Sequence, residues 1–362
     1  MPTAATSIRV FVLLSILPLA LSISAAAQPM QSLLVLSKHD HTLSIVDPAT
    51  FKVMARAPVG PDPHEVVASE DGKTAYVSIY GGGAYHTLNV IDLVSQKRLA
   101  DIDTGALNGP HGLAFVGGKV WFTAEGAKAI ARYDPAVNKI DWIMGTGQNR
   151  THMLYVTAGQ KQIYTTNVNA ATVSILELTP QELRPPPMRP GSQSGTGTPP
   201  SGPPPGAGGP PRMDWNQTVI PVGPGDEGFD VSPEGRELWT ANAHDGTLSV
   251  VDIAAKKNVA TIDAKVYGAN RLKFTPDGKY VLIASLGDSD LVIYDAASRK
   301  EFKRVKIGHG AAGIQMQPDG ARAYIACTPD NYVAVLDLKT FTVVGHIEAG
   351  GEPDGLAWAV RR

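Results

Sequence analysis

The sequence contains a single cysteine and carries almost no net charge. Cys327 has no second cysteine to pair with, which excludes an internal disulfide, and its place in the apolar segment ARAYIAC predicts a buried, unreactive thiol. The 32 basic and 34 acidic side chains give a formal net charge of −2, so the chain has no overall positive field to attract nucleic acid. Nucleic acid is therefore not an expected partner.

Several common site motifs are missing. The chain has no G-x-S-x-G nucleophile elbow, no P-loop, no glycine-rich dinucleotide fingerprint and no CxxCH haem attachment. No serine has a spacing that singles it out as a nucleophile. Any chemistry must therefore come from residues that the fold brings together.

Long hydrophobic runs are also absent, except at the start of the chain. Arg9 precedes an apolar run over residues 10–23, and three alanines then form a small-residue cleavage site before Gln28. This layout predicts a signal peptide over residues 1–27. Because no later segment approaches about 18 continuous apolar residues, we expect a mature chain without a membrane span, located in the periplasm or secreted.

What the sequence does contain is one strand pattern repeated seven times. Each copy has an apolar strand that ends in an acidic residue, and successive markers are 42 to 45 residues apart, except for one gap of 75. A fixed period in the low forties with several short strands per unit is typical of a β-propeller. The markers are Asp47, Asp92, Asp134, Glu177, Asp252, Asp295 and Asp337.

The complete repeats each contain four strand segments separated by turn residues. The C-terminal segment GGEPDGLAWAV supplies only a first strand, whereas the N-terminal segment SLLVLSKHDHTLSIVDPATFKVMAR supplies only the last three. The sequence therefore predicts an all-β, seven-bladed β-propeller with four-stranded blades over residues 28–362. Its ring closes where the C-terminal innermost strand pairs with the N-terminal strands, which removes exposed sheet edges.

The long gap between markers contains a proline- and glycine-rich insert at about residues 184–212. Such a composition can bury little apolar surface and favours extended, solvated backbone. We expect a disordered loop in the fourth blade, with partner docking as the alternative to a purely structural role.

The strings ELWTANAHDGTLSVVD, TAYVSIY and QIYTTNVNAATVSILE resemble the YVTN repeat. Apart from the insert, the chain after residue 27 resembles the YncE-like periplasmic seven-bladed propellers. Relatives of this repeat include binding proteins, cytochrome d1-like haem propellers and lactonase-type enzymes. The resemblance therefore implies an architecture without selecting one activity.

Aligning the seven innermost strands places one residue of each at a common position near the channel mouth. In chain order these residues are His64, His111, His152, Glu227, Asn270, Ala312 and Asp354. Imidazoles and carboxylates that converge on one point can bind a divalent metal, so His64, His111, His152, Glu227 and Asp354 are the predicted metal ligands.

Other residues near this mouth are predicted to bind a small ligand. Arg271 and Asn270 belong to the same strand start, and the arginine can hold an anionic group. His86 and His244 lie in turns between second and third strands, which reach the same face of the propeller. The alternative is that these histidines only hydrogen-bond neighbouring loops.

These observations favour an exported binding or interaction module, with a small ligand or a periplasmic protein as its partner. An enzyme is the first alternative, namely a metal-assisted lactonase or lyase in which a cation polarises a carbonyl and a further histidine acts as base. A haem-binding propeller with one axial histidine is the second. The cofactor, if any, is a divalent metal ion ahead of haem.

Overall fold

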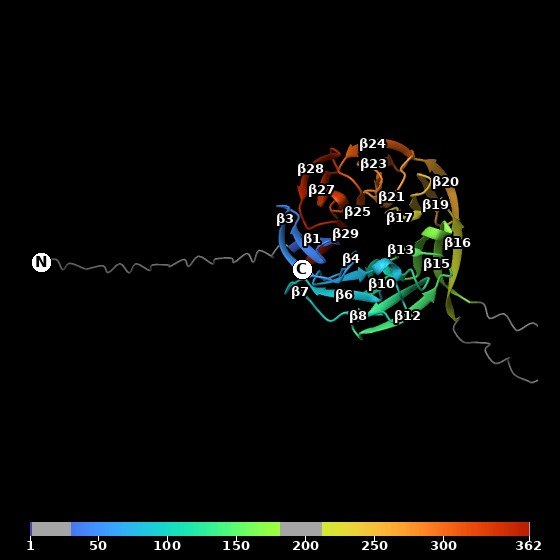
Figure 1. Cartoon of the computed structure of the whole chain (residues 1–362), viewed down its shortest axis with the longest axis horizontal. Coiled ribbons are helices and arrows are strands. Elements are labelled where there is room, and N and C mark those ends of the chain that lie inside the picture. The colour runs from blue at the N-terminus through green and yellow to red at the C-terminus, as the bar shows by residue number, and fades with distance from the viewer. Residues whose placement is uncertain (2–29, 182–211, 362) are drawn as a thin grey trace, which may run out of the picture.

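Seven antiparallel sheets surround a central axis in the computed structural model, which describes Met1 and residues 30–181 and 212–361. Each sheet is one blade, and Figure 1 shows the first strand of a blade near the centre and the last strand on the rim. This arrangement confirms the predicted seven-bladed propeller. The predicted signal peptide and nearly all of the insert lie outside the described residues.

We number the blades in chain order from the N-terminal strands. Blade 1 contains β29 (Pro353–Arg361), β1 (Met30–Ser37), β2 (Thr42–Asp47) and β3 (Lys52–Pro58). Blade 2 contains β4 (Pro63–Ala68), β5 (Thr74–Ile79), β6 (Thr87–Asp92) and an outer edge in two pieces, β7 (Lys97–Arg98) and β8 (Ile102–Asp103). Blade 3 contains β9 (Pro110–Val116), β10 (Lys119–Ala124), β11 (Ala129–Asp134) and β12 (Lys139–Gly145).

The other four blades have four strands each. Blade 4 contains β13 (Thr151–Val156), β14 (Gln162–Asn167), β15 (Thr172–Pro180) and β16 (Met213–Pro221). Blade 5 contains β17 (Asp226–Val231), β18 (Glu237–Asn242), β19 (Thr247–Asp252) and β20 (Lys257–Asp263). Blade 6 contains β21 (Ala269–Phe274), β22 (Tyr280–Ser285), β23 (Asp290–Asp295) and β24 (Lys300–Lys306). Blade 7 contains β25 (Ala311–Met316), β26 (Arg322–Cys327), β27 (Tyr332–Asp337) and β28 (Thr342–Ile347).

Helix is confined to three single turns in the described part of the chain. They are the 3-10 segments η1 (Gly81–Gly83), η2 (Val168–Ala170) and η3 (Thr328–Asp330). None of the helical segments that the structure describes has the length and apolarity needed to span a lipid bilayer.

The ring closes as predicted, because β29 pairs with β1 in an antiparallel ladder. The register runs from Met30 opposite Arg361 to Ser37 opposite Pro353. The two ends of the described propeller thus share one sheet, and β29 pairs with the edge of β1 that would otherwise be exposed.

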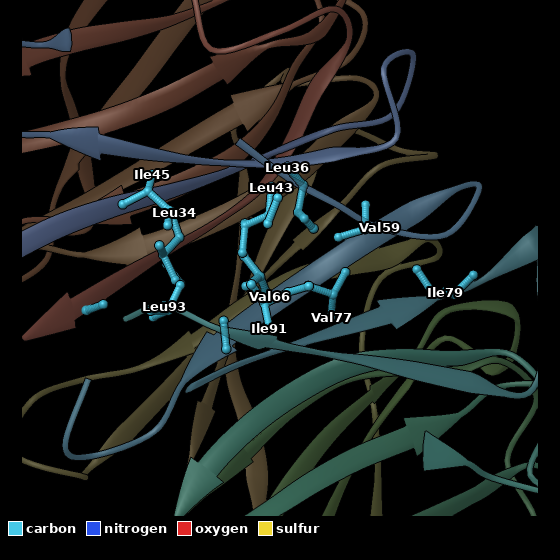
Figure 2. Close-up of a cluster of buried hydrophobic side chains, with 14 residues drawn as sticks. Leu34, Leu36, Leu43, Ile45, Val59, Val66, Val77, Ile79, Ile91 and Leu93 are labelled. Atoms are coloured by element: carbon cyan, nitrogen blue, oxygen red, sulfur yellow. The ribbon is translucent and has the colours of Figure 1, made fainter. Parts of the chain in front are cut away.

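The hydrophobic core is divided among the seven interfaces between neighbouring blades. Among the described residues, each of seven buried clusters draws its side chains from two adjacent blades. Figure 2 shows the cluster between blades 1 and 2, where Leu34 and Leu43 face Val66 and Val77. Cys327 is buried in the cluster between blades 6 and 7, and burial raises the pKa of its thiol to about 12. The predicted unreactive thiol agrees with that environment.

The acidic markers have a local structural role. In six blades the marker aspartate ends the third strand and accepts a hydrogen bond from a backbone N–H two or three residues later, which stabilises the turn to the outer strand. Blade 4 has Glu177 instead, and this side chain bonds to Gln162 and Lys256. No tight turn follows Glu177, because β15 and β16 continue to pair as far as Pro180 opposite Met213, where the insert begins.

Small and large residues alternate around the ring at one position of the innermost strands. This position directly follows the residue that the alignment places at the channel mouth, such as His64 in blade 2. Four blades have glycine there, and a Cβ atom on each would lie 2.2–2.7 Å from the backbone of the next blade. The other three blades carry the side chains that fill the channel and touch one another. The glycines are Gly112, Gly228, Gly313 and Gly355, and the three large residues are Glu65, Met153 and Arg271.

We expect Gly313→Ala to lower the free energy of unfolding by about 1–3 kcal/mol. The new methyl group would lie 2.2 Å from the carbonyl oxygen of Asp354, and neither strand can move without disturbing the ring. Thermal melting followed by circular dichroism measures the effect. Gly159→Ala is the control, because no atom lies within 4 Å of its added Cβ, and equal melting temperatures for the two variants would contradict the interpretation.

Candidate functional site

The seven residues that the sequence places at the channel mouth are the second residues of the seven innermost strands. In every blade the pairing between the innermost and second strands has an irregularity at this point. Such bulges redirect a side chain out of the regular ladder and are common beside functional sites. All seven residues line one cavity of about 230 Å³, together with Lys38, Glu65, Arg150, Arg271, Leu286 and Thr328.

Three histidine rings from consecutive blades pack against one another at this mouth. The ring centroids of His64 and His111 are 5.0 Å apart, and those of His111 and His152 are 4.0 Å apart. Tyr80, from blade 2, makes edge contacts with His64 and His111. The predicted convergence of the three histidines is therefore present in the structure.

His152 is held between two carboxylates. Its Nδ1 contacts Glu125, and its Nε2 lies 3.0 Å from Glu227 Oε2. Burial alone lowers the pKa of His152, but the hydrogen bonds and charges of the two glutamates outweigh this and raise it to about 9. His152 is therefore an imidazolium at neutral pH.

The two glutamates are further bound by Arg150, which precedes β13. Its Nη1 donates to Glu227 at 2.8 Å, and its Nε lies 3.5 Å from Glu125. Burial raises the pKa of Glu227, but the bond and charge of His152 and then Arg150 lower it to about 2. Tyr80 also donates to Glu125, at 2.5 Å. Blades 2 to 5 are thus joined by one network of charged hydrogen bonds.

His111 differs from its neighbours because its ring makes no hydrogen bond with any described residue. The side chain is only 4% exposed, and its Nδ1 atom is enclosed without a partner. Burial, followed by repulsion from His152 and His64, holds the pKa of His111 well below its usual value. This imidazole is therefore neutral and keeps a lone pair available.

His64 faces two further carboxylates. Its Nε2 lies 2.9 Å from Asp62 Oδ1, whereas its Nδ1 lies 3.8 Å from Asp354 Oδ2, which is beyond hydrogen-bond distance. The bond from His64 lowers the pKa of Asp62 to about 2. Asp354 pairs instead with Lys38 at 2.7 Å.

The floor of the cavity is a side-chain bridge across the channel. Arg271 on blade 6 forms a buried ion pair with Glu65 on blade 2, and its Nη1 lies 3.3 Å from the Met153 sulfur. Its Nε also donates to the backbone oxygen of Ala312 at 3.3 Å. Ala312 is the one mouth residue with an apolar side chain, and its carbonyl group acts as an acceptor at this point of the ring. Below the bridge lies a second cavity of about 320 Å³, which Glu65 and Arg271 also line.

A subset of these residues has the composition of a metal centre. His111, Glu125 and His152 offer ligand atoms that all lie within 4.8 Å of one another. Two imidazoles and one carboxylate form a known donor set for zinc. Of the predicted ligands, His64, Glu227 and Asp354 line the same cavity but lie outside this group of three.

The mouth does not fit haem. The rings of His64, His111 and His152 contact one another and leave no flat slot between them for a macrocycle. No step involving haem is therefore derived for this site.

Two predicted ligand-binding residues lie away from the mouth. His86 is exposed and bonds to Asp103 at 2.8 Å, and His244 is exposed beside Gly225. Neither residue lines the cavity. Asn270 and Arg271, by contrast, both line it.

Sequence reasoning missed Glu125 and Arg150. Glu125 lies in the turn after β10, one of the turns between second and third strands in which only histidines were predicted to be functional. Arg150 comes directly before β13, two residues ahead of His152. The signal for both in the sequence is a charged residue of any type in these turns and strand starts.

Part of the chain matches the model of a known protein family, and its fold matches several solved structures. The sequence model of the family described as "Lactonase, 7-bladed beta-propeller" matches residues 226–353. No curated protein sequence matches the chain.

Three solved structures share the fold at low sequence identity. A Bacteroides uniformis protein assigned as a 6-phosphogluconolactonase is 15% identical, with 91% of this chain and 99% of that chain covered and a TM-score of 0.68. A protein of unknown function from Desulfotomaculum acetoxidans is 12% identical, with 91% and 98% covered and a TM-score of 0.67. Dihydro-heme d1 dehydrogenase NirN, in complex with DHE, is 14% identical, with 89% and 65% covered and a TM-score of 0.58. At these identities the similarity establishes the β-propeller fold.

Beside the mouth, Asp226 gives a pH-dependent contribution to stability. Its side chain is fully buried, Oδ1 has no partner among the described residues, and burial raises its pKa to about 7. The folded protein therefore gains stability from this group as the pH falls from about 8 towards 4, because the folded state binds the proton more tightly than the unfolded chain.

We expect Asp226→Asn to raise the free energy of unfolding at pH 8 by on the order of 2 kcal/mol and to change it much less at pH 4, where the carboxyl group is largely protonated in the unfolded chain as well. The amide removes the buried negative charge but can still accept the hydrogen bond from the Asn167 backbone. Urea unfolding at both pH values measures the difference. Asp288→Asn, at an exposed position, is the control, and the same pH dependence in both variants would refute the assignment.

Proposed function

We propose that this protein is an exported, YncE-like binding propeller whose mouth cavity holds a small molecule with acceptor oxygens, such as a carboxylate or a lactone. The observation that carries the proposal is the convergence of all seven strand starts on a single polar cavity. A concave site with a few convergent polar groups is the usual form of a ligand site. Its physiological partner would be a small molecule in the periplasm.

The unused hydrogen-bond donors around the cavity favour a ligand rich in acceptors. Arg271 has five N–H donors and uses three of them on described residues. Arg150 donates one hydrogen bond to a described residue, and Asn270 makes one long bond of 3.4 Å to Ala312. The carboxylates, in contrast, are paired with Lys38, Arg150, His152 or Arg271.

The size of the cavity limits the ligand. A volume of about 230 Å³ corresponds to roughly eight water molecules at about 30 Å³ each. This space suits a single sugar acid or sugar lactone. A protein partner would have to bind elsewhere on the propeller.

Calorimetric titration with gluconate and δ-gluconolactone tests the proposal. We expect Arg271→Lys to weaken binding by about tenfold or more, because lysine keeps the charge opposite Glu65 but loses the additional donors of the guanidinium. His86→Ala is the matched control and should bind like the unchanged protein. Binding of neither compound, or equal binding by all three proteins, would overturn the proposed ligand class.

Hydrolysis of a lactone is the second candidate function, favoured by the pair of His64 and Asp62. An imidazole oriented by a carboxylate is the arrangement of a general base. His64 Nδ1 would take a proton from water as the water oxygen bonds to the lactone carbonyl, and the donors of Arg271 would stabilise the negative oxygen. The ring C–O bond then breaks, and the proton passes to the leaving oxygen. The lactonase family match over residues 226–353 supports this alternative.

We expect His64→Gln to reduce any lactone hydrolysis by about 100-fold or more, with little change in lactone affinity. The measurement is the rate of acid release from δ-gluconolactone above the uncatalysed rate. His86→Gln is the control, since His86 also pairs with an aspartate but lies outside the cavity. An equal loss of rate in both variants would exclude His64 as the base.

A further inference from the structure

Two blades bring three side chains of metal-binding types together at the channel mouth. His111 belongs to β9, Glu125 follows β10, and His152 belongs to β13. All three are more than nine-tenths buried, with exposed fractions of 4%, 7% and 4%, and their ligand atoms lie within 4.8 Å of one another. Because the strands of two packed blades carry them, the three groups are held in place before any ligand arrives.

His111 supplies an independent indication that a partner is missing from this group. Buried polar atoms in proteins nearly always have hydrogen-bond partners. The ring of His111 has none among the described residues, although it lies between the rings of His64 and His152. A bound cation would satisfy this imidazole without a change in its packing.

The charges around the group also favour a cation. Five carboxylates and three permanently charged basic side chains line the mouth or bond to the residues that line it. With the imidazoles neutral, as ligation requires, two negative charges remain, and a divalent cation neutralises them. The carboxylates are those of Asp62, Glu65, Glu125, Glu227 and Asp354, and the basic residues are Lys38, Arg150 and Arg271.

We propose that His111, Glu125 and His152 bind one divalent transition-metal cation, such as zinc, at the channel mouth. The cation takes the place of the proton that joins His152 to Glu125. Glu227 then accepts from the opposite nitrogen of His152 and orients the ring, as outer carboxylates do for metal-bound histidines. Tyr80 supports Glu125 through its hydroxyl group.

This site goes beyond the binding of a small organic ligand and is tested with the metal alone. The full-length chain is purified without a histidine tag, stripped with a chelator and titrated with zinc chloride by calorimetry, and metal content is measured after dialysis. We expect one zinc ion per chain. His111→Phe and Glu125→Gln should each weaken binding by at least about 100-fold.

His64→Gln is the matched control, because His64 lies in the same cavity next to His111 but outside the group of three. It should retain zinc within about threefold of the unchanged protein. His111→Phe keeps an aromatic ring of similar shape and removes no hydrogen bond, so its fold should survive, which circular dichroism verifies. Should that variant unfold, the Glu125→Gln result decides.

Three outcomes would overturn the proposal: no zinc uptake by the unchanged protein, unchanged uptake in His111→Phe and Glu125→Gln, or an equal loss in His64→Gln. The test is also independent of the proposed ligand. Zinc uptake without binding of gluconate or δ-gluconolactone would refute only the proposed organic ligand, and the reverse result would refute only the metal.

Discussion

The close approach of seven innermost strands around one axis constrains the rest of this propeller. At the position just below the mouth, the backbones are so near one another that a Cβ on Gly355 would lie 2.2 Å from the carbonyl oxygen of His64. Only some blades can carry side chains there. The chain places glycine in four blades and the channel-filling Glu65, Met153 and Arg271 in the other three. The channel is therefore divided into a mouth cavity and a lower cavity by side chains instead of by a loop.

The charged network at the mouth follows from the same crowding. The residues at the strand starts lie close enough for charges to pair across blades, as Arg150 of blade 4 pairs with Glu227 of blade 5. Charges also pair within a blade, as Lys38 pairs with Asp354 in blade 1. Buried charges of this kind add little net stability by themselves, but removal of one partner is costly. The network thus restricts the relative positions of the blades that form the site. His111 stands apart as the neutral member with an unused nitrogen.

The fold was largely predictable because its signals are local and repeated. An aspartate that ends each third strand stabilises the next turn, and even the exception, Glu177, coincides with the one hairpin that lacks a tight turn. Strand alignment also placed His64, His111 and His152 together, since position along a strand sets depth in the channel. The contact between Glu125 and His152 could not be predicted, because a turn has no fixed register with the strand starts. Which nitrogen of a ring lacks a partner, as in His111, depends on packing and cannot be read from sequence.

The alternation of small and large residues in the channel cannot be perfect in a ring with an odd number of members. Seven blades force two neighbours of the same kind, and here they are blades 7 and 1, with Gly313 and Gly355. Because blades 7 and 1 both have glycine, two adjacent blades next to blade 6 contribute no side chain to the channel at this depth. Arg271 fills the resulting gap, passing the carbonyl of Ala312 to reach Glu65 on blade 2. In a ring of six or eight such blades, small and large residues could alternate without a break and no such gap would form. The long side chain of Arg271 in the channel is therefore a consequence of the odd number of blades.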